Sequence, residues 1–509
     1  MAKAMMHAAV RVRFAPSPTG RIHVGNLRTA VFNHLFARHN KGKLLLRIED
    51  TDRERSTPEA EERLFEALRW MEIDWDEEGD DRFYRQSQHR DRHMEIVEEW
   101  LKKGIAYRSD RPTGLLGGGP GGKSSGRSSG GSGAGSAGAS DAGGRAAGEA
   151  IWLKTEPEDL RYDDLILGKQ SQPARQMQDF VLVRSNGVPV FIFANAVDDA
   201  DMRVTHVLRG ADHATNTFRQ LLIYRALGVE APRFGHMPLI VDKQGKKLSK
   251  REGDPESLIY LDEFRECGYL PEALFNFMAL LGWSPEPHAG DDGEMIFREK
   301  LSRDELIAEF DLGRVGKAPA QFDTVKLGAM NYDYIVDRLN HDEGSLIAHL
   351  KQDVRDEGLD PDQFDDAQYG VLIREAAQRA RTLKELIEKS RFFFLDRVEV
   401  NVGYKMVRKA FANDAVWSRL DATIAKLEGI AQSEWKRGRL ETAIKKLAEE
   451  LAGGKMGDIA QPVRILTTGG PASPPIDVTL ELLGRQRTLD RLRDDDNRGR
   501  LKMNDTQGN

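Results

Sequence analysis

The fold of this chain is decided by the stretch Phe14-Ala15-Pro16-Ser17-Pro18-Thr19-Gly20-Arg21-Ile22-His23-Val24-Gly25-Asn26. Residues 11–15 are expected to form a short strand, and residues 16–21 a tight turn. Apolar residues then recur at helical spacing up to Gly42, and a second apolar strand follows at residues 44–48. A strand, a helix and a second strand in this order favour a parallel sheet with a right-handed crossover. The expected fold class is therefore α/β.

His23 and Gly25 lie where the turn enters the expected helix. A helix N-terminus offers N–H groups and a favourable dipole to phosphate. Gly25 lets a ligand approach the backbone closely, and His23 can donate a hydrogen bond to a phosphate oxygen. The same residues also fit plain turn chemistry with a surface histidine, and this stretch alone does not separate the two interpretations.

A basic loop far downstream supports the phosphate interpretation. It reads Gly245-Lys246-Lys247-Leu248-Ser249-Lys250-Arg251 and follows an apolar strand expected at residues 237–241. A short basic run is usually a solvated surface feature. Here, however, it lies at the carboxyl end of a strand, where open parallel sheets bind ligands, and its ammonium groups can reach triphosphate oxygens. The two stretches together predict a site for a nucleoside triphosphate.

Composition limits the remaining possibilities. A chain of 509 residues suggests several domains, and a net charge of −7 with 75 Lys and Arg leaves nucleic-acid binding to local patches. Cys267 is the single cysteine, which excludes an internal disulfide. No signal peptide or long apolar run is evident, so we expect a cytoplasmic protein without membrane contact. His89 and His93 have the spacing of two metal ligands but no third ligand, which favours a solvated helix face.

Further elements follow from capping residues and periodicity. One helix is expected to begin with Thr57 as N-cap and Pro58 as first residue, and another to cover residues 96–101. Strands are expected at residues 179–183 and 190–194, with a turn at 186–187 between them. The buried face of the first helix and the apolar positions of later helices are Leu64, Phe65, Leu68, Met71, Leu274, Phe277, Met278, Leu281, Leu372, Leu383 and Leu386.

Residues 114–148 are mostly Gly, Ser, Ala and Arg. Such a stretch cannot bury enough apolar surface to offset the entropy of ordering, so we expect it to be disordered. A natural flexible loop and a local reading-frame error in the gene model both remain open explanations.

Several motifs give the chain a resemblance to bacterial glutamyl-tRNA synthetases, which are class I aminoacyl-tRNA synthetases. They occur in the family's order and cover nearly the whole chain apart from residues 114–148. Besides the two stretches above, they are Arg47-Ile48-Glu49-Asp50-Thr51-Asp52, Val197-Asp198-Asp199, Val207-Leu208-Arg209-Gly210, Tyr269-Leu270-Pro271-Glu272-Ala273-Leu274, Leu281-Gly282-Trp283-Ser284 and Ala460-Gln461-Pro462-Val463-Arg464.

The resemblance implies a Rossmann-like parallel-sheet catalytic domain in two halves, residues 1–108 and 188–251. Between them would lie an inserted connective, acceptor-binding domain, 109–187, whose Gly/Ser-rich stretch 114–148 departs from the family pattern. A helical linking domain that contacts the tRNA stem, 252–330, and an all-helical anticodon-binding region, 331–509, would follow. Arg379 resembles the family's anticodon-contact position, although an exposed helical arginine explains it equally well.

The implied activity is that of a glutamate–tRNA ligase. It would activate L-glutamate with ATP and Mg²⁺ to glutamyl-adenylate and transfer glutamate to the 3′-terminal adenosine of tRNA(Glu). No zinc is expected, because the connective region has no cysteines, and the protein is expected to be a monomer. A non-discriminating enzyme that also charges tRNA(Gln) and a non-catalytic tRNA-binding paralogue remain alternatives.

The resemblance also assigns residues to each substrate. Arg13 and Arg209 would bind the glutamate carboxylates, Glu49 the amino group, and Phe191 stands where the family usually has a tyrosine. The remaining glutamate-site residues would be Ala15, Ser17 and Asn195. ATP would be bound by Pro16, Ser17, His23, Gly25, Asn26, Lys247, Ser249 and Lys250, of which His23, Lys247 and Lys250 would do the catalytic charge work.

Overall fold

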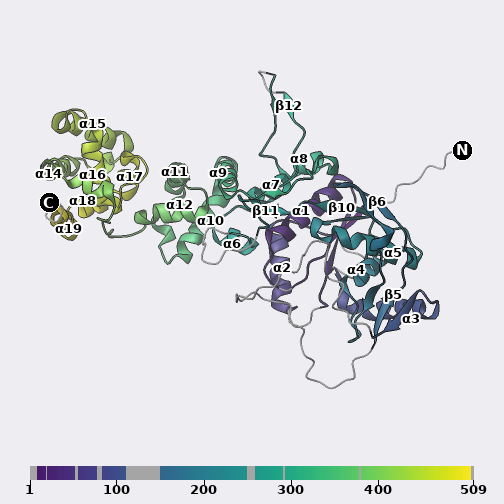
Figure 1. Cartoon of the computed structure of the whole chain (residues 1–509). Coiled ribbons are helices and arrows are strands. Elements are labelled where there is room, and N and C mark those ends of the chain that lie inside the picture. Colours follow the sequence, from purple (N-terminus) through teal and green to yellow (C-terminus); the bar gives the residue numbers. More distant parts are fainter. Residues whose placement is uncertain are drawn as a thin grey trace, which may run out of the picture. The chain divides into compact units, whose positions relative to one another are not determined.

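The computed structural model describes residues 9–18, 20–51, 56–76, 83–110, 149–248, 258–289, 293–377 and 380–505 (Figure 1). The Gly/Ser-rich stretch and the predicted site residues Ser249, Lys250 and Arg379 lie outside these ranges. The chain divides into two compact units. The first comprises Met1–Asp262 with Phe275–Asp323, and the second comprises Glu263–Leu274 with Thr324–Asn509.

A parallel sheet forms the centre of the first unit. Its strands are β1 (Arg11–Phe14), β2 (Lys43–Ile48), β3 (Tyr84–Arg85), β9 (His206–Gly210) and β10 (Arg233–Met237). β2 pairs in parallel with both β1 and β3, and β9 pairs in parallel with β10. The N–H of Thr205 donates to the carbonyl of Arg11 at 2.9 Å, which places β9 next to β1. The predicted α/β class and its parallel sheet are confirmed.

The main helices of this unit alternate with its strands along the chain. They are α1 (Val24–His39), α2 (Pro58–Trp70), α3 (Arg90–Lys102), α4 (Phe191–Asp201) and α5 (Ala214–Leu227). Thr57 caps α2 by accepting from the N–H of Ala60 at 3.2 Å, as predicted. Leu64 and Leu68 are buried, whereas Phe65 is half-buried and stacks on Trp75.

Two predicted strands are wrong in part or in whole. Residues 190–194 do not form a strand, because Phe191 begins helix α4. The helix is buried around most of its circumference, with Phe193, Ala196 and Val197 in the core, and a short apolar run of this kind does not distinguish a strand from a buried helix. The strand predicted at 237–241 is interrupted at Pro238, whose nitrogen cannot donate to a neighbouring strand.

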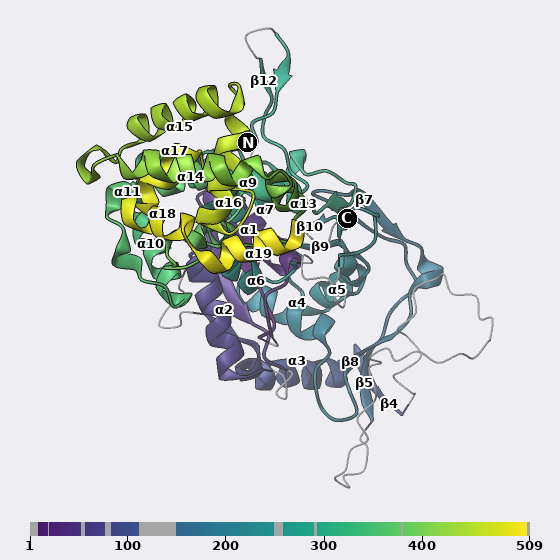
Figure 2. The same ribbon diagram turned by 90° about the vertical axis from the view of Figure 1, so that its left-hand side faces the viewer.

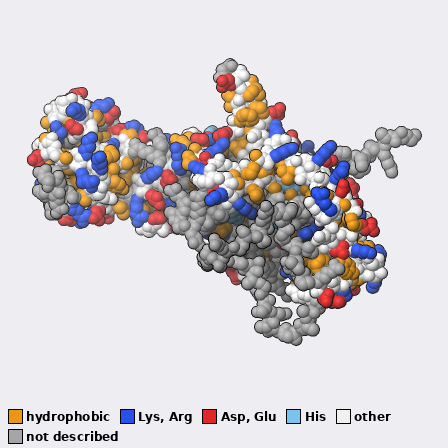
Figure 3. Space-filling view, in the orientation of Figure 1, with side chains coloured by type: hydrophobic (Ala, Val, Ile, Leu, Met, Phe, Trp, Pro, Cys, Tyr) orange, Lys and Arg blue, Asp and Glu red, His pale blue; other side chains and the backbone are white. Residues whose placement is uncertain are grey.

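The chain on the two sides of that proline joins different sheets. β10 ends at Met237, and β11 (Ile240–Val241) pairs in parallel with β14 (Ala320–Gln321). Further elements of the first unit are α8 (Arg303–Glu309) and the hairpin of β12 (His288–Ala289) and β13 (Met295–Ile296). The division between the two units falls within α6 (Leu261–Glu266) and within α7 (Pro271–Leu280). The hairpin projects from the first unit with apolar side chains at its surface, Met295 and Ile296 being 58% and 47% exposed (Figure 3).

The segment between the two halves of the parallel sheet forms antiparallel structure. β4 (Ala106–Ser109), β5 (Ala150–Leu153) and β8 (Phe180–Val183) form one sheet next to α3 (Figure 2). The strand predicted at 179–183 is thus confirmed, as is the turn at 186–187, where Gly187 has φ 75°. β6 (Leu160–Asp164) and β7 (Gly168–Gln172) form a hairpin.

This β6–β7 hairpin is bound to the parallel sheet at β10. The N–H of Leu165 donates to the carbonyl of Phe234 at 2.8 Å. Gly235 permits the approach, because a Cβ at this position would lie 2.8 Å from Leu208 Cδ2 and 3.5 Å from Leu165 Cβ. The close packing brings the end of β6 beside His236 of β10.

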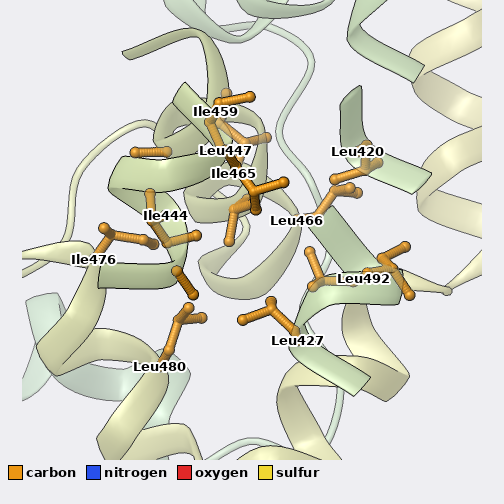
Figure 4. Packing of buried hydrophobic residues seen from close by; sticks show 14 of the residues in the cluster. Leu420, Leu427, Ile444, Leu447, Ile459, Ile465, Leu466, Ile476, Leu480 and Leu492 are labelled. Carbon is orange, nitrogen blue, oxygen red and sulfur yellow. The ribbon is translucent and has the colours of Figure 1, made fainter. Parts of the chain in front are cut away.

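Every element of the second unit within its described residues is helical. Its main helices are α9 (Thr324–His341), α10 (Glu343–Asp356), α11 (Asp366–Ala377), α12 (Leu383–Ser390), α13 (Lys405–Phe411), α14 (Ala415–Glu428), α15 (Arg437–Ala452), α16 (Met456–Thr468), α17 (Ile476–Leu483), α18 (Arg485–Leu492) and α19 (Asp495–Asp505). Leucine and isoleucine side chains of α14 to α18 pack together in its core (Figure 4). The predicted helical C-terminal region is confirmed. Within the described ranges, no helix combines the length and apolar character needed to span a bilayer.

Candidate active site

Residues that follow the parallel strands line a cavity of about 620 Å³ in the first unit. Ala15 to Ser17 follow β1, Glu49 follows β2, Gly210 ends β9, and Pro238 follows β10. Ligands bind at this carboxyl edge in open parallel sheets. The cavity brings together twelve predicted site residues: Arg13, Ala15, Pro16, Ser17, His23, Gly25, Asn26, Glu49, Phe191, Asn195, Arg209 and Lys247.

His23 caps helix α1 at the rim of this cavity. Its Nδ1 accepts from the N–H of Gly25 at 3.1 Å, so a neutral ring carries its proton on Nε2. The N–H of Val24 donates to the carbonyl of Ile259 at 2.9 Å. The amides of Val24 and Gly25 therefore have partners within the protein, and the expectation that the helix start offers free amides to phosphate does not hold for these two. Nε2 of His23 carries the predicted donor function instead.

The basic loop begins as a tight hairpin. The N–H of Leu248 donates to the carbonyl of Ile240 at 3.0 Å, and the turn uses Gly245 with φ 75°. The hairpin directs Lys247 to the cavity, where its Nζ lies 3.6 Å from Asp212 Oδ2. Partial burial lowers the pKa of His23, and the positive charge of Lys247 lowers it further. His23 is thus held as a neutral donor beside a cation.

A buried ionic cluster connects β1, β2 and α4 below the cavity. Arg47 is fully buried, and its guanidinium donates to Asp199 Oδ1 at 2.5 Å, to Glu49 Oε1 at 3.3 Å and to Asn195 Oδ1. Arg13 Nε donates to the same Asp199 oxygen at 2.9 Å. The Asn195 amide donates to Glu49 Oε1 at 2.6 Å. The cluster thereby fixes three predicted glutamate-site residues.

Arg47 and Asp199 are the centre of this cluster, yet the sequence assigned them no role. The signal was present, because both belong to motifs that carry the family resemblance. Although burial opposes ionisation, Arg13 and Arg47 hold the pKa of Asp199 below its ordinary value. For Glu49 burial prevails and raises the pKa. The two carboxyl groups of one cluster therefore differ in how readily they protonate.

Arg209 differs from Arg13 because its partners are neutral. It is 6% exposed and donates from Nη2 to Thr217 Oγ1 at 2.9 Å and to Gln220 Oε1 at 2.7 Å, and from Nε to His236 Nε2 at 3.1 Å. Within the described residues, Nη1 is buried without a hydrogen-bond partner. Burial, together with the nearby charge of Arg13, lowers the pKa of Arg209 to about 10. Among the described residues, Arg209 is thus a cation of the cavity that makes no ion pair with a carboxylate.

The sequence suggested that His89 and His93 lie on a solvated helix face, and this prediction is wrong. His93 is buried, with Nε2 2.7 Å from Asp198 Oδ1, while His89 stacks on Tyr84 at a ring distance of 3.8 Å. The spacing gave no indication that α4 supplies Asp198 to this face. In the described part of the chain, no three His, Cys, Asp or Glu side chains form a group that could hold a metal ion.

Comparison with known proteins agrees with this arrangement. The family described as "tRNA synthetases class I (E and Q), catalytic domain" matches residues 9–329, and the family described as "Anticodon binding domain" matches residues 345–495. The fold is that of a class I tRNA synthetase.

Individual relatives give a narrower assignment. Glutamate–tRNA ligase 1 of Granulibacter bethesdensis is 39% identical over 486 residues, which cover 95% of this chain and 96% of the relative. The glutamate–tRNA ligase of Symbiobacterium thermophilum is 38% identical, with coverage of 95% and 99%. The crystal structure of a glutamate tRNA ligase from Elizabethkingia meningosepticum in complex with its amino acid matches with a TM-score of 0.76 and 29% identity, covering 95% of this chain and 98% of that one. The chain belongs to the glutamate–tRNA ligase family, and the resemblance carried by its motifs is confirmed.

Proposed function

We propose that the protein activates L-glutamate with ATP and transfers the glutamyl group to the 3′-terminal adenosine of tRNA(Glu). The observation that carries the proposal is one cavity whose lining, which also includes Arg28 and Asp212, brings together the guanidinium groups of Arg13 and Arg209, the carboxylate of Glu49, and the pair His23 and Lys247. Glutamate has two carboxylates and one ammonium group, so these charges complement it. The family membership of the chain supports the same substrates.

The glutamate side of the cavity is proposed to work by charge pairing. Glu49 receives the ammonium group, and Arg13 and Arg209 receive the carboxylates, with Asn195 holding Glu49 in place. Asp199 already offsets the charge of Arg13, whereas the partners of Arg209 within the described part of the chain are neutral. A substrate carboxylate therefore gains most at Arg209, since a buried charge is costly until it is paired.

The chemical steps need no side-chain nucleophile. An oxygen of the glutamate α-carboxylate attacks the α-phosphorus of ATP, and pyrophosphate leaves. A hydroxyl of the tRNA 3′-terminal adenosine then attacks the carbonyl carbon of the adenylate, and AMP leaves. His23, Lys247, Ser249 and Lys250 are proposed to stabilise the charge on the phosphates, next to Pro16, Ser17, Gly25 and Asn26, and Mg²⁺ is proposed to enter with ATP.

ATP–pyrophosphate exchange tests the proposal directly. Glutamate-dependent exchange, measured with and without tRNA, is expected from the purified protein, together with charging of tRNA(Glu). Binding of tRNA without any exchange would identify a non-catalytic paralogue instead. Parallel charging of tRNA(Gln) distinguishes a non-discriminating enzyme from one specific for tRNA(Glu).

The raised pKa of Glu49 predicts an acid-sensitive affinity for glutamate. Binding of the substrate ammonium requires the ionised carboxylate, and burial makes Glu49 protonate at a higher pH than an ordinary glutamate. The KM for glutamate is therefore expected to rise as pH falls through this raised pKa, while the KM for ATP stays nearly constant. Glu49→Gln is expected to raise the KM at all pH values and to remove its acid limb. An unaltered acid limb in this variant would contradict the role of Glu49.

Phe191 predicts a variant that binds glutamate better than the natural chain. Phe191 is the first residue of α4 and lines the cavity. It is 41% exposed, and its ring centroid lies 5.5 Å from that of His213. Phe191→Tyr restores the hydroxyl that the family usually has, and we expect it to lower the KM for glutamate by about threefold or more through one added hydrogen bond to a charged group. Phe191→Leu is the control without ring or hydroxyl. An equal KM in the natural chain and the Phe191→Tyr variant would contradict this prediction.

The remaining assignments complete the proposal. Arg379 would contact the anticodon, and the division at residues 108, 187, 251 and 330 would separate the functional regions. A cytoplasmic monomer is also proposed, and one without zinc because the connective region has no cysteines.

A further inference from the structure

A buried chain of three side chains extends from the β6–β7 hairpin to the cavity. Asp164, at the end of β6, lies 2.5 Å through Oδ2 from His236 Nδ1. His236, in β10, accepts at Nε2 from Arg209 Nε at 3.1 Å. The side chains of Asp164 and His236 are both fully buried. Of the three, only Arg209 lines the cavity.

The hydrogen bonds determine which nitrogen of His236 carries its proton. An arginine nitrogen can only donate, so Nε2 of His236 must be an acceptor. A neutral ring then has its proton on Nδ1, directed at the Asp164 carboxylate. The Thr217 hydroxyl lies 3.2 Å from the same Nε2 and accepts from Arg209 Nη2, which leaves its own proton for the ring. In a neutral ring with its proton on Nδ1, the Arg209 N–H and the Thr217 hydroxyl share the single lone pair of Nε2, while Nδ1 donates to Asp164.

Asp164 is held in turn by the backbone. Its Oδ1 accepts from the N–H groups of Ile166, Leu167 and His236 at 2.9, 2.8 and 3.1 Å. Three backbone donors on one oxygen leave Oδ2 facing the imidazole. The orientation of the carboxylate is therefore set by the tight turn of the hairpin.

The contacts of Arg209 leave Nη1 without a hydrogen-bond partner among the described residues. Nε donates to His236, and Nη2 donates to Thr217 and Gln220, so the two remaining N–H groups are those of Nη1. We propose that Asp164 and His236 are positioning residues for substrate recognition: Asp164 fixes the Nδ1–H tautomer of His236, and the ring orients Arg209 so that Nη1 binds a carboxylate of the substrate. The inference rests on the proposed use of glutamate.

Asp164→Asn provides a sharp test because it retains the shape of the side chain. The amide oxygen can keep the three backbone donors, and the amide nitrogen then replaces Oδ2 opposite the ring. A donor at this place forces Nδ1 to accept and moves the ring proton to Nε2, against the N–H of Arg209. We expect the KM for glutamate to rise by about tenfold or more, with the KM for ATP unchanged. The exposed neighbour supplies the matched control, Asp163→Asn, with both constants unchanged.

Two substitutions of His236 separate positioning from general packing. In His236→Gln the side-chain oxygen replaces Nε2 and still accepts from Arg209, whereas in His236→Asn the amide replaces Nδ1 and leaves Arg209 without its acceptor. The KM for glutamate is expected to stay within about threefold of the natural value in the first variant and to rise by about tenfold or more in the second. In the double variant Asp164→Asn/His236→Gln, the KM for glutamate is expected to return to near the natural value. Equal effects of both His236 variants would overturn the proposal, as would an unchanged glutamate KM in Asp164→Asn.

Nitrogen-15 NMR of labelled histidine observes the tautomer without an activity assay, and the spectrum of His236→Gln assigns the signal. The natural protein is expected to show a protonated Nδ1 and a bare Nε2 at His236, and Asp164→Asn the reverse. A natural ring protonated on Nε2 would overturn this inference even if glutamate exchange is normal. If the tautomer is as expected but the protein shows no glutamate-dependent ATP–pyrophosphate exchange, the proposed function is refuted and the inference about His236 is not.

Discussion

Replacement of Arg209 by methionine is expected to reduce kcat/KM for glutamate by at least about a hundredfold, because the substrate carboxylate loses its buried, otherwise unpaired cation. The folded protein should tolerate the change, with a free energy of unfolding within about 2 kcal/mol of the natural value. Arg209 pairs with no carboxylate among the described residues; its partners there are a histidine, a threonine, a glutamine and a backbone carbonyl. Exchange kinetics and urea unfolding measure the two effects.

The methionine variant also has a specific control in ATP binding. Arg209 is proposed to bind glutamate and not ATP, so the KM for ATP should remain unchanged. A comparable loss in the affinities for ATP and glutamate would show that the variant distorts the whole cavity, and this would contradict a selective role in carboxylate binding.

Replacement of Arg47 by methionine is expected to reduce the stability of the folded protein strongly, whereas replacement of Arg209 reduces it little. Arg47→Met removes the cation that pairs with both Asp199 and Glu49 in a fully buried setting. Loss of one partner from a buried ion pair typically costs about 3–5 kcal/mol, since the remaining charge stays desolvated. We expect a loss of this size in the free energy of unfolding, measured by urea denaturation.

An exposed arginine supplies the matched comparison for Arg47. Arg69 pairs with Glu62 on the surface of α2, and both side chains are 59% exposed. Arg69→Met should change the free energy of unfolding by less than about 1 kcal/mol, because solvent screens such pairs. Similar losses in the two variants would show that burial of the Arg47 cluster does not determine its contribution.

The sequence predicted those features of the fold that depend on residues close together in the chain. The start of helix α1 at His23, the cap at Thr57 and the parallel pairing of the first strands follow from short-range rules, and the structure has them. Helix α4 was missed because a helix buried on most sides lacks the one-sided apolar period that identifies helices. The pairing of His93 with Asp198 joins two segments 105 residues apart, which no local pattern encodes.

The site shows the same limit. Motif order identified Arg13, Glu49, Asn195 and Arg209, and the structure places all four at one cavity. Motif order could not show that Asp199 pairs with Arg13 while Arg209 pairs with no carboxylate among the described residues, because those contacts depend on how β1, β9 and α4 pack. His236 had no sequence signal of its own, since its role depends on the hairpin that approaches at Gly235.

The ionic cluster has a consequence for how the chain acquires its pocket during synthesis. Arg13 and Asp199 are 186 residues apart, and Glu49 and Asn195 are 146 apart. At ordinary rates of translation, Asp199 and Asn195 are synthesised on the order of ten seconds or more after Arg13 and Glu49. During that interval Arg13 and Arg47 stay charged and hydrated, and the pocket cannot close around them. A nascent chain that ends before Asn195 is therefore expected to have no affinity for glutamate, even though Arg13 and Glu49 have already been synthesised.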